Sequence, residues 1–101
     1  MKSGLDYFSR AGLPLDMEQW NVLWEQKEYR TVGNTTLADS TIVSTVWLGL
    51  AHGERQGQPV IFETMVFNKT GEPVETKRYC TEAEALVGHD QAVAAWKLIV
   101  E

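Results

Sequence analysis

Cysteine, proline and basic residues are scarce in this chain of 101 residues, and long apolar runs are missing from it. Cys80 is the single cysteine, which excludes an intramolecular disulfide and any metal site built from several thiolates. Nothing approaches the run of about 20 apolar residues that a membrane-spanning helix needs. The start of the chain is polar and has no apolar segment typical of a secretory signal. We therefore expect a cytoplasmic protein that does not associate with a membrane.

The charge is acidic and diffuse. Nine Lys and Arg stand against 14 Asp and Glu, a net charge of −5, and the cations are scattered along the chain. Phosphate backbones are bound by clustered cations, so this distribution argues against a nucleic-acid partner. With 44% hydrophobic and 23% charged residues and no stretch rich in Pro, Gly and Ser, residues 1–101 are expected to form a single domain.

The N-terminal part predicts one helix. Residues 1–15 mix glycine, proline and large apolar residues, which favours an irregular or briefly hairpinned start. Asp16, followed three residues later by Gln19, resembles a capping box. Apolar residues then recur at spacings of three and four, so we predict a helix over about residues 17–27.

Four later segments favour β-strands because they are rich in β-branched and aromatic residues. They cover about residues 29–36, 41–50, 60–68 and 74–79, with a loop over 51–58 between the second and third. The second is the strongest and is expected to be central. Side chains alternate across a strand, and we expect the face of Ile42, Val46 and Leu48 to pack on the core.

The last element is a well-capped helix. Thr81 and Glu84 form a capping box, and an apolar stripe follows, so the helix is predicted over about residues 82–98 and packs on the sheet. Gly88 interrupts this helix, and a glycine inside a helix costs about 1 kcal/mol of stability compared with alanine. Close approach of the helix to a strand or a ligand at Gly88 would offset this cost. The predicted fold is α+β: an antiparallel meander of about four strands with an N-terminal and a C-terminal helix packed on it.

Glu63 is the most conspicuous polar residue of the third strand. If the loop closes a hairpin near residues 54–55, Glu63 lies opposite about Trp47. Thr45 and Met65 then share its face. One interpretation is a partly buried carboxylate with a raised pKa that binds a ligand or acts as an acid or base. The favoured interpretation is an outward carboxylate on the solvent face, paired with a cation.

The two histidines do not make a metal site, because no third ligand stands at a recognisable spacing. His52 follows the second strand and is interpreted as a loop hydrogen-bonding residue. His89 lies on the apolar stripe of the last helix and is interpreted as a core histidine with satisfied hydrogen bonds. Both remain candidates beside Glu63, because helix and strand ends meet in such folds.

Trp47 lies on the face opposite Ile42 and Val46, so it is either covered by a helix or exposed. An exposed Trp47 would form part of an apolar interface patch. No Gly-x-Ser-x-Gly elbow is present, and no glycine-rich loop precedes a helix, so we expect neither acyl transfer nor a nucleotide cofactor.

Three segments carry a resemblance. VSTVWLGL (43–50), IFETMVF (61–67) and RYCTEAEALVGH (78–89), in this order, resemble a family of small uncharacterised proteins common in bacteriophage and prophage genomes. The resemblance covers roughly residues 12–96 and implies a phage or prophage origin, with no transferable activity. The family pattern has a serine where this chain has Cys80, which argues against a reactive thiol there.

We therefore expect a non-enzymatic phage accessory protein that binds a host or phage protein, or sequesters a small ligand. The thin core of a short chain also suggests a homodimer. The alternatives are a small hydrolase that uses Glu63 with His52 or His89, and a structural or assembly component of the virion. No cofactor or metal is expected. The candidate binding residues are Trp47, Glu63, Thr45, Met65, His52 and His89.

Overall fold

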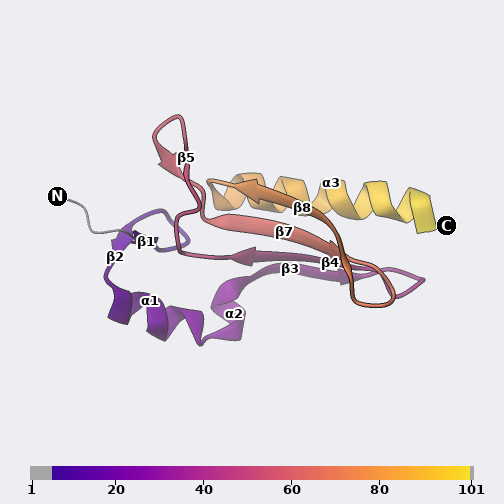
Figure 1. Ribbon diagram of the computed structural model, residues 1–101, viewed down its shortest axis with the longest axis horizontal. Helices are drawn as coiled ribbons and strands as arrows, with labels where there is room; N and C mark the ends of the chain where they lie inside the picture. Colours follow the sequence, from indigo (N-terminus) through magenta and orange to yellow (C-terminus); the bar gives the residue numbers. More distant parts are fainter. Residues whose placement is uncertain (1–5, 101) are drawn as a thin grey trace.

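The computed structural model describes residues 6–100, whose main feature is a four-stranded antiparallel sheet with a long helix across one face (Figure 1). The strands are β3 (Thr31–Thr36), β4 (Ile42–Trp47), β7 (Phe62–Phe67) and β8 (Pro73–Tyr79). They pair in the order β3-β4-β7-β8, each antiparallel to its neighbour. This confirms the predicted α+β meander.

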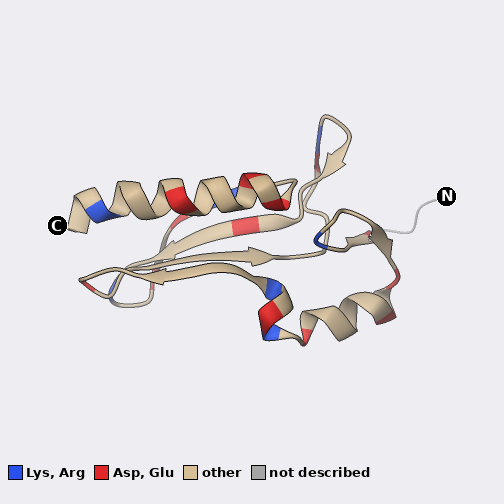
Figure 2. Ribbon diagram, turned by 180° about the vertical axis from the view of Figure 1, so that it is seen from behind, with Lys and Arg blue, Asp and Glu red and all other residues tan. Residues whose placement is uncertain are grey.

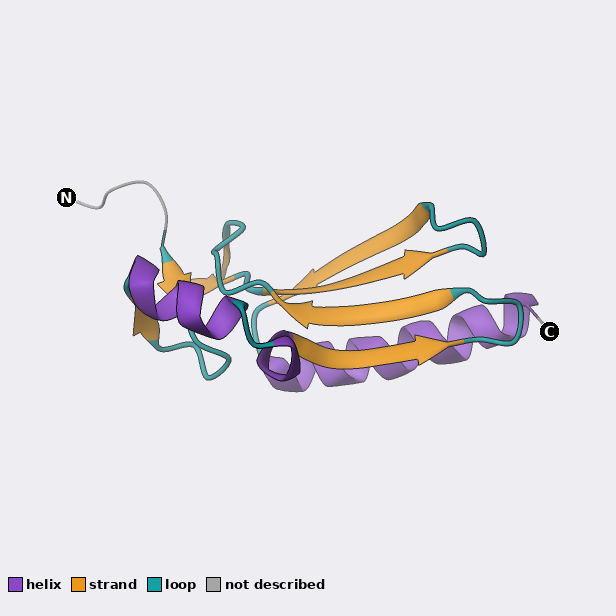
Figure 3. Cartoon of the chain, turned by 90° about the horizontal axis from the view of Figure 1, so that it is seen from below, coloured by secondary structure: helices purple, strands orange, loops and turns teal. Residues whose placement is uncertain are grey.

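The long helix α3 (Glu82–Val100) lies along the sheet and covers one of its faces (Figure 3). Its N-terminus has the predicted capping box. The Glu84 backbone N–H donates to Thr81 Oγ1 at 3.1 Å, and the Glu84 carboxylate accepts from the Thr81 N–H at 3.2 Å. The helix ends two residues beyond the predicted range.

Two short helices lie beyond one end of the sheet (Figure 1). The capping box at α1 (Met17–Trp24) is confirmed: the Asp16 carboxylate accepts from the Gln19 N–H at 2.8 Å, and Gln19 Oε1 accepts from the Asp16 N–H at 2.9 Å. The predicted range of 17–27 is too long, because α1 stops at residue 24 and a separate helix follows.

That second helix, α2 (Lys27–Arg30), contains Tyr29, so the prediction that Tyr29 lies in a strand is wrong. The Tyr29 N–H donates to the Gln26 carbonyl at 3.0 Å. The helical turn directs the aromatic ring onto Trp47, with ring centroids 4.8 Å apart and edge-to-face. Burial of the ring in the core thus outweighs the β preference of a tyrosine that precedes β-branched residues.

Two small hairpins complete the fold. β1 (Tyr7–Phe8) pairs with β2 (Pro14–Leu15), in agreement with a briefly hairpinned start; residues 1–5 of that segment lie outside the described residues. The segment 51–58, predicted to be a loop, contains β5 (Glu54–Arg55) and pairs it with β6 (Gln58–Pro59). The turn between them has positive φ at both central residues, the geometry of a tight hairpin turn.

The core lies between α3 and the sheet face that carries Val43, Thr45 and Trp47, all of which are fully buried. The prediction that the face of Ile42, Val46 and Leu48 packs on the core is wrong, because these residues are only half-buried. Both sets are rich in β-branched residues, so alternation alone does not distinguish them.

Candidate functional site

Trp47 belongs to the core. Its indole is inaccessible to solvent, and its Nε1–H donates to the Phe8 carbonyl at 3.0 Å. The ring contacts Tyr29 and Trp24. Of the two placements left open for Trp47, the covered one is correct, and the buried side chain offers no surface for a ligand.

Thr45 and His89 form a buried polar bridge between the sheet and α3. His89 Nδ1 lies 2.7 Å from Thr45 Oγ1, and His89 Nε2 lies 2.9 Å from Thr35 Oγ1. Thr45 Oγ1 also lies 2.6 Å from Thr64 Oγ1. The imidazole packs against Gly33, where a Cβ atom would stand only 3.0 Å from the ring. His89 is therefore a core histidine with both nitrogens paired, as the favoured interpretation held.

Burial lowers the pKa of His89 below its ordinary value of 6.5, and the Asp90 carboxylate opposes this shift only in part. The unfolded chain then binds a proton at His89 more readily than the folded protein does. The stability that the neutral imidazole contributes is complete above pH 6.5 and is lost as the pH falls below that value.

We expect the urea concentration at the unfolding midpoint of the wild type to decrease when the pH is lowered from 7.5 to 5.5. The decrease should be smaller in His89→Gln, which has no imidazole at this position to protonate. All other titratable groups are the same in both proteins and provide the common background. An equal fall in the two proteins would contradict a buried neutral His89.

Glu63 lies on the opposite face of the sheet from His89. Its carboxylate accepts from Arg78 Nε at 3.0 Å, with side chains 13% and 44% exposed respectively. The outer face and the pairing with a cation agree with the favoured interpretation, whereas the partial burial of the Glu63 side chain agrees with the other one. The register expected for it is wrong by one residue, because Glu63 pairs with Val46 and not with Trp47. A shift of one residue exchanges the faces, so Thr45 lies on the far side of the sheet from Glu63.

We call the face that carries Glu63 the open face. No helix crosses it in the part of the chain that the structure describes (Figure 3). Strand register brings half-buried apolar side chains together at its centre, from two neighbouring strands, and places exposed polar residues at its margins. The central residues are Ile42, Ser44, Val46, Glu63, Met65 and Phe67; the marginal ones are Asn34, Thr36, Thr76 and Arg78.

Met65 is the one predicted site residue that shares the open face with Glu63. His52 is exposed in the connection after β4, where its backbone N–H donates to the Val60 carbonyl at 2.9 Å. Val60 lies three residues before Glu63, roughly 10 Å along an extended chain. The six predicted residues therefore occupy separate places: the open face, the buried side of the sheet and a connecting loop.

A further surface feature lies along β8 and was not found by sequence reasoning. Two adjoining open hollows flank this strand, and Arg55 and Tyr79 line both of them. Arg55 Nη1 donates to the Arg78 backbone carbonyl at 2.9 Å. In the sequence Arg55 is one charged residue in a polar stretch, and nothing there indicates its contact with a strand more than 20 residues later.

Charged residues are dispersed over the molecule. Acidic and basic residues are spread over most elements of the ribbon (Figure 2). Among residues 6–100, no three His, Cys, Asp or Glu side chains are placed to hold a metal ion. Cys80 is buried, with its Sγ 3.6 Å from the Gln58 carbonyl.

Within residues 6–100, no helix combines the length and the apolar character needed to cross a membrane. No protein-family model, no curated protein and no solved structure matches the chain. The class of protein is therefore described from its fold alone. It is an α+β chain whose four-stranded antiparallel sheet is covered by a helix on one face and, among the described residues, has no helix on the other.

Proposed function

We propose that this chain is a non-enzymatic accessory protein of a bacteriophage or prophage, which binds a host or phage protein in the host cytoplasm through its open face. One observation carries the proposal: apolar side chains from β4 and β7 meet at the centre of that face, and polar residues surround them. An apolar centre within a polar margin is the usual anatomy of a protein interface.

The proposed partner is a protein surface with an apolar patch that matches Val46, Met65 and Phe67, and with hydrogen-bonding groups around it. A protein fits better than a small molecule, because small-molecule sites are concave whereas an uncovered sheet face is broad. The Glu63 and Arg78 ion pair lies beside the apolar centre and supplies both an acceptor and a donor for orientation.

The positions of the titratable candidates favour binding over catalysis. A hydrolase that used Glu63 with a histidine would need the two groups within hydrogen-bond reach of one substrate. His89 lies beneath α3, with both ring nitrogens paired to threonines, and Glu63 lies on the other side of the sheet. His52 lies in the connection beyond the end of β4.

The phage origin rests on sequence motifs, and two of them supply the open face. The segments 43–50 and 61–67 cover most of β4 and β7, the central strands of the sheet. Alternate residues of these motifs build the core, and the residues between them face outward. This supports a binding role for the part of the chain that resembles phage proteins.

The test compares three proteins in a capture experiment from bacterial lysate made after phage infection. Met65→Arg places a charge at the centre of the open face, and Val22→Arg is the matched control, since Val22 is 61% exposed on α1. We expect wild type and Val22→Arg to retain the same protein, and Met65→Arg to bind that protein, once purified, at least about tenfold more weakly. Equal binding by all three, with unchanged circular dichroism, would exclude the open face.

A further inference from the structure

β8 is an edge strand: within residues 6–100 no further strand pairs with its outer side. The Tyr79 carbonyl accepts from the Ile61 N–H at 3.1 Å and so points toward β7, whereas the Arg78 carbonyl points outward to Arg55. Backbone groups alternate along an antiparallel strand, so the N–H and carbonyl of Thr76 point outward as those of Arg78 do. Thr76 is exposed and lies at the middle of this free edge.

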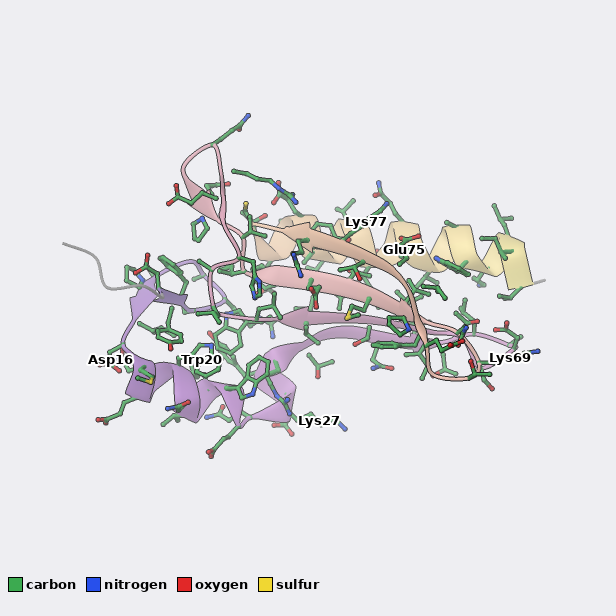
Figure 4. The ribbon with its side chains drawn as sticks, viewed as in Figure 1. Asp16, Trp20, Lys27, Lys69, Glu75 and Lys77 are labelled. Carbon is green, nitrogen blue, oxygen red and sulfur yellow. The ribbon has the colours of Figure 1, made fainter. Side chains whose placement is uncertain are left out.

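Opposite charges flank Thr76 on the α3 side of the strand, where Glu75 and Lys77 lie beside the helix (Figure 4). The Glu75 carboxylate accepts from Trp96 Nε1 at 3.4 Å, which fixes its side of the sheet. Lys77 is exposed and pairs in register with the buried Thr64, so it lies on the same side. The edge thus presents an acidic residue, a threonine and a basic residue in this order, and the backbone groups of the central threonine point away from the sheet.

This order of charges is complementary to itself. When two copies of an antiparallel strand are related by a twofold axis, the axis passes between two copies of one residue. An axis at Thr76 places Glu75 opposite the second copy's Lys77, and Lys77 opposite the second copy's Glu75. An axis at any charged residue of β8 instead places that residue opposite its own copy, with like charges in contact.

We propose that β8 pairs with β8 of a second copy of this chain, antiparallel and centred on Thr76, so that two four-stranded sheets form one continuous eight-stranded sheet. Each Thr76 donates its N–H to the other Thr76 carbonyl, and two Glu75–Lys77 pairs flank these hydrogen bonds. The interface is isologous and closed, because each copy uses its β8 edge once.

Neighbouring features confine the pairing to this centre. A bulge between Glu75 and Pro73 disturbs the strand on one side, and Arg55 already occupies the Arg78 carbonyl on the other. Bulges and charged residues on edge strands hinder pairing with arbitrary strands. Here they leave the one stretch in which the charges of two copies match.

The argument for the dimer does not use the proposed binding role, but the dimer would give that role a second binding site. A twofold axis perpendicular to the sheet keeps both α3 helices on one side and both open faces on the other. The two open faces then form one surface with two equivalent sites, so a dimeric partner would bind with an avidity that a monomer lacks.

The experiment measures mass by sedimentation equilibrium from about 1 to about 300 µM. We expect wild type to be dimeric at the upper concentrations. Lys77→Glu should weaken the dimer at least about tenfold, because a carboxylate at position 77 then faces Glu75 of the second copy. The double variant Glu75→Lys, Lys77→Glu restores the opposite charges and should recover the dimer. Dimerisation of the wild type should weaken in about 1 M salt, which screens exposed ion pairs.

Thr76→Pro is the second test. Proline removes the outward N–H at position 76 and leaves the hydrogen bonds between β7 and β8 intact. We expect this variant to be monomeric, with the circular dichroism of the wild type. A wild type that stays monomeric at the highest concentration would overturn the proposal. So would a dimer that persists unchanged in Thr76→Pro or Lys77→Glu. Capture through Met65 needs only one open face, which a monomer also has, so the two proposals fail separately.

Discussion

Replacing Trp47 by alanine should lower the free energy of unfolding by about 4 kcal/mol. The indole is fully buried at the junction of the sheet, the N-terminal hairpin and α2, where it contacts Tyr29 and donates to the Phe8 carbonyl. Alanine would leave a large cavity and an unpaired carbonyl. Urea unfolding followed by circular dichroism measures the loss, since three other tryptophans would complicate a fluorescence signal.

Trp47→Phe is the matched control for this prediction. It keeps most of the aromatic volume and removes only the Nε1–H donor, so we expect a loss of about 1 to 2 kcal/mol. Equal losses in Trp47→Phe and Trp47→Ala would mean that the hydrogen bond to Phe8, and not the packing, dominates. A loss below about 1 kcal/mol in Trp47→Ala would contradict the central place of this residue in the core.

Gly88→Ala should destabilise the protein by about 2 kcal/mol, although alanine is the better helix former by about 1 kcal/mol. A Cβ atom at position 88 would collide with the Tyr79 hydroxyl and ring, which lie against the helix backbone. The steric cost therefore outweighs the gain in helix propensity. Thermal or urea unfolding gives both the sign and the size of the change.

A double variant separates the two contributions. Tyr79→Ala removes the ring that a methyl group at position 88 would meet, and in that background Gly88→Ala should become neutral or stabilising. If Gly88→Ala destabilises equally with and without Tyr79, contact with β8 is not the reason for the glycine. Non-additivity of this kind is the expected result for two residues in direct contact.

The glycine also shows how much a local pattern can predict. A glycine inside a helix pattern costs stability, so the sequence predicted a close approach to a strand or a ligand at position 88. The structure shows a strand, through Tyr79. Which strand, and which side chain on it, depends on the register of β8 against β7 and on where α3 crosses, and neither is encoded within a few residues.

The candidate site was predicted less well than the fold. An error of one residue in register placed Glu63 opposite Trp47, whereas it pairs with Val46. Because side chains alternate along a strand, that error joined Thr45 to Glu63 on one face. The environment of Trp47 stayed open for another reason, because the opposite face of its strand was taken as the core. The contact of Arg55 with the Arg78 carbonyl was not predicted either. It forms only because the hairpin that carries Arg55 lies beside the edge of the sheet, and the local sequence does not encode that arrangement.

By itself the sequence determined the N-termini of α1 and α3, and the four strands of the main sheet with their order. Capping boxes at Asp16 and Thr81 act within a single turn, and β-branched runs favour extended backbone wherever they lie. Only the tertiary structure decided which side of the sheet α3 covers, and hence that Trp47 is buried and Met65 lies on the open face. Both faces of β4 are apolar enough to be core, and the choice depends on packing between elements distant in the chain.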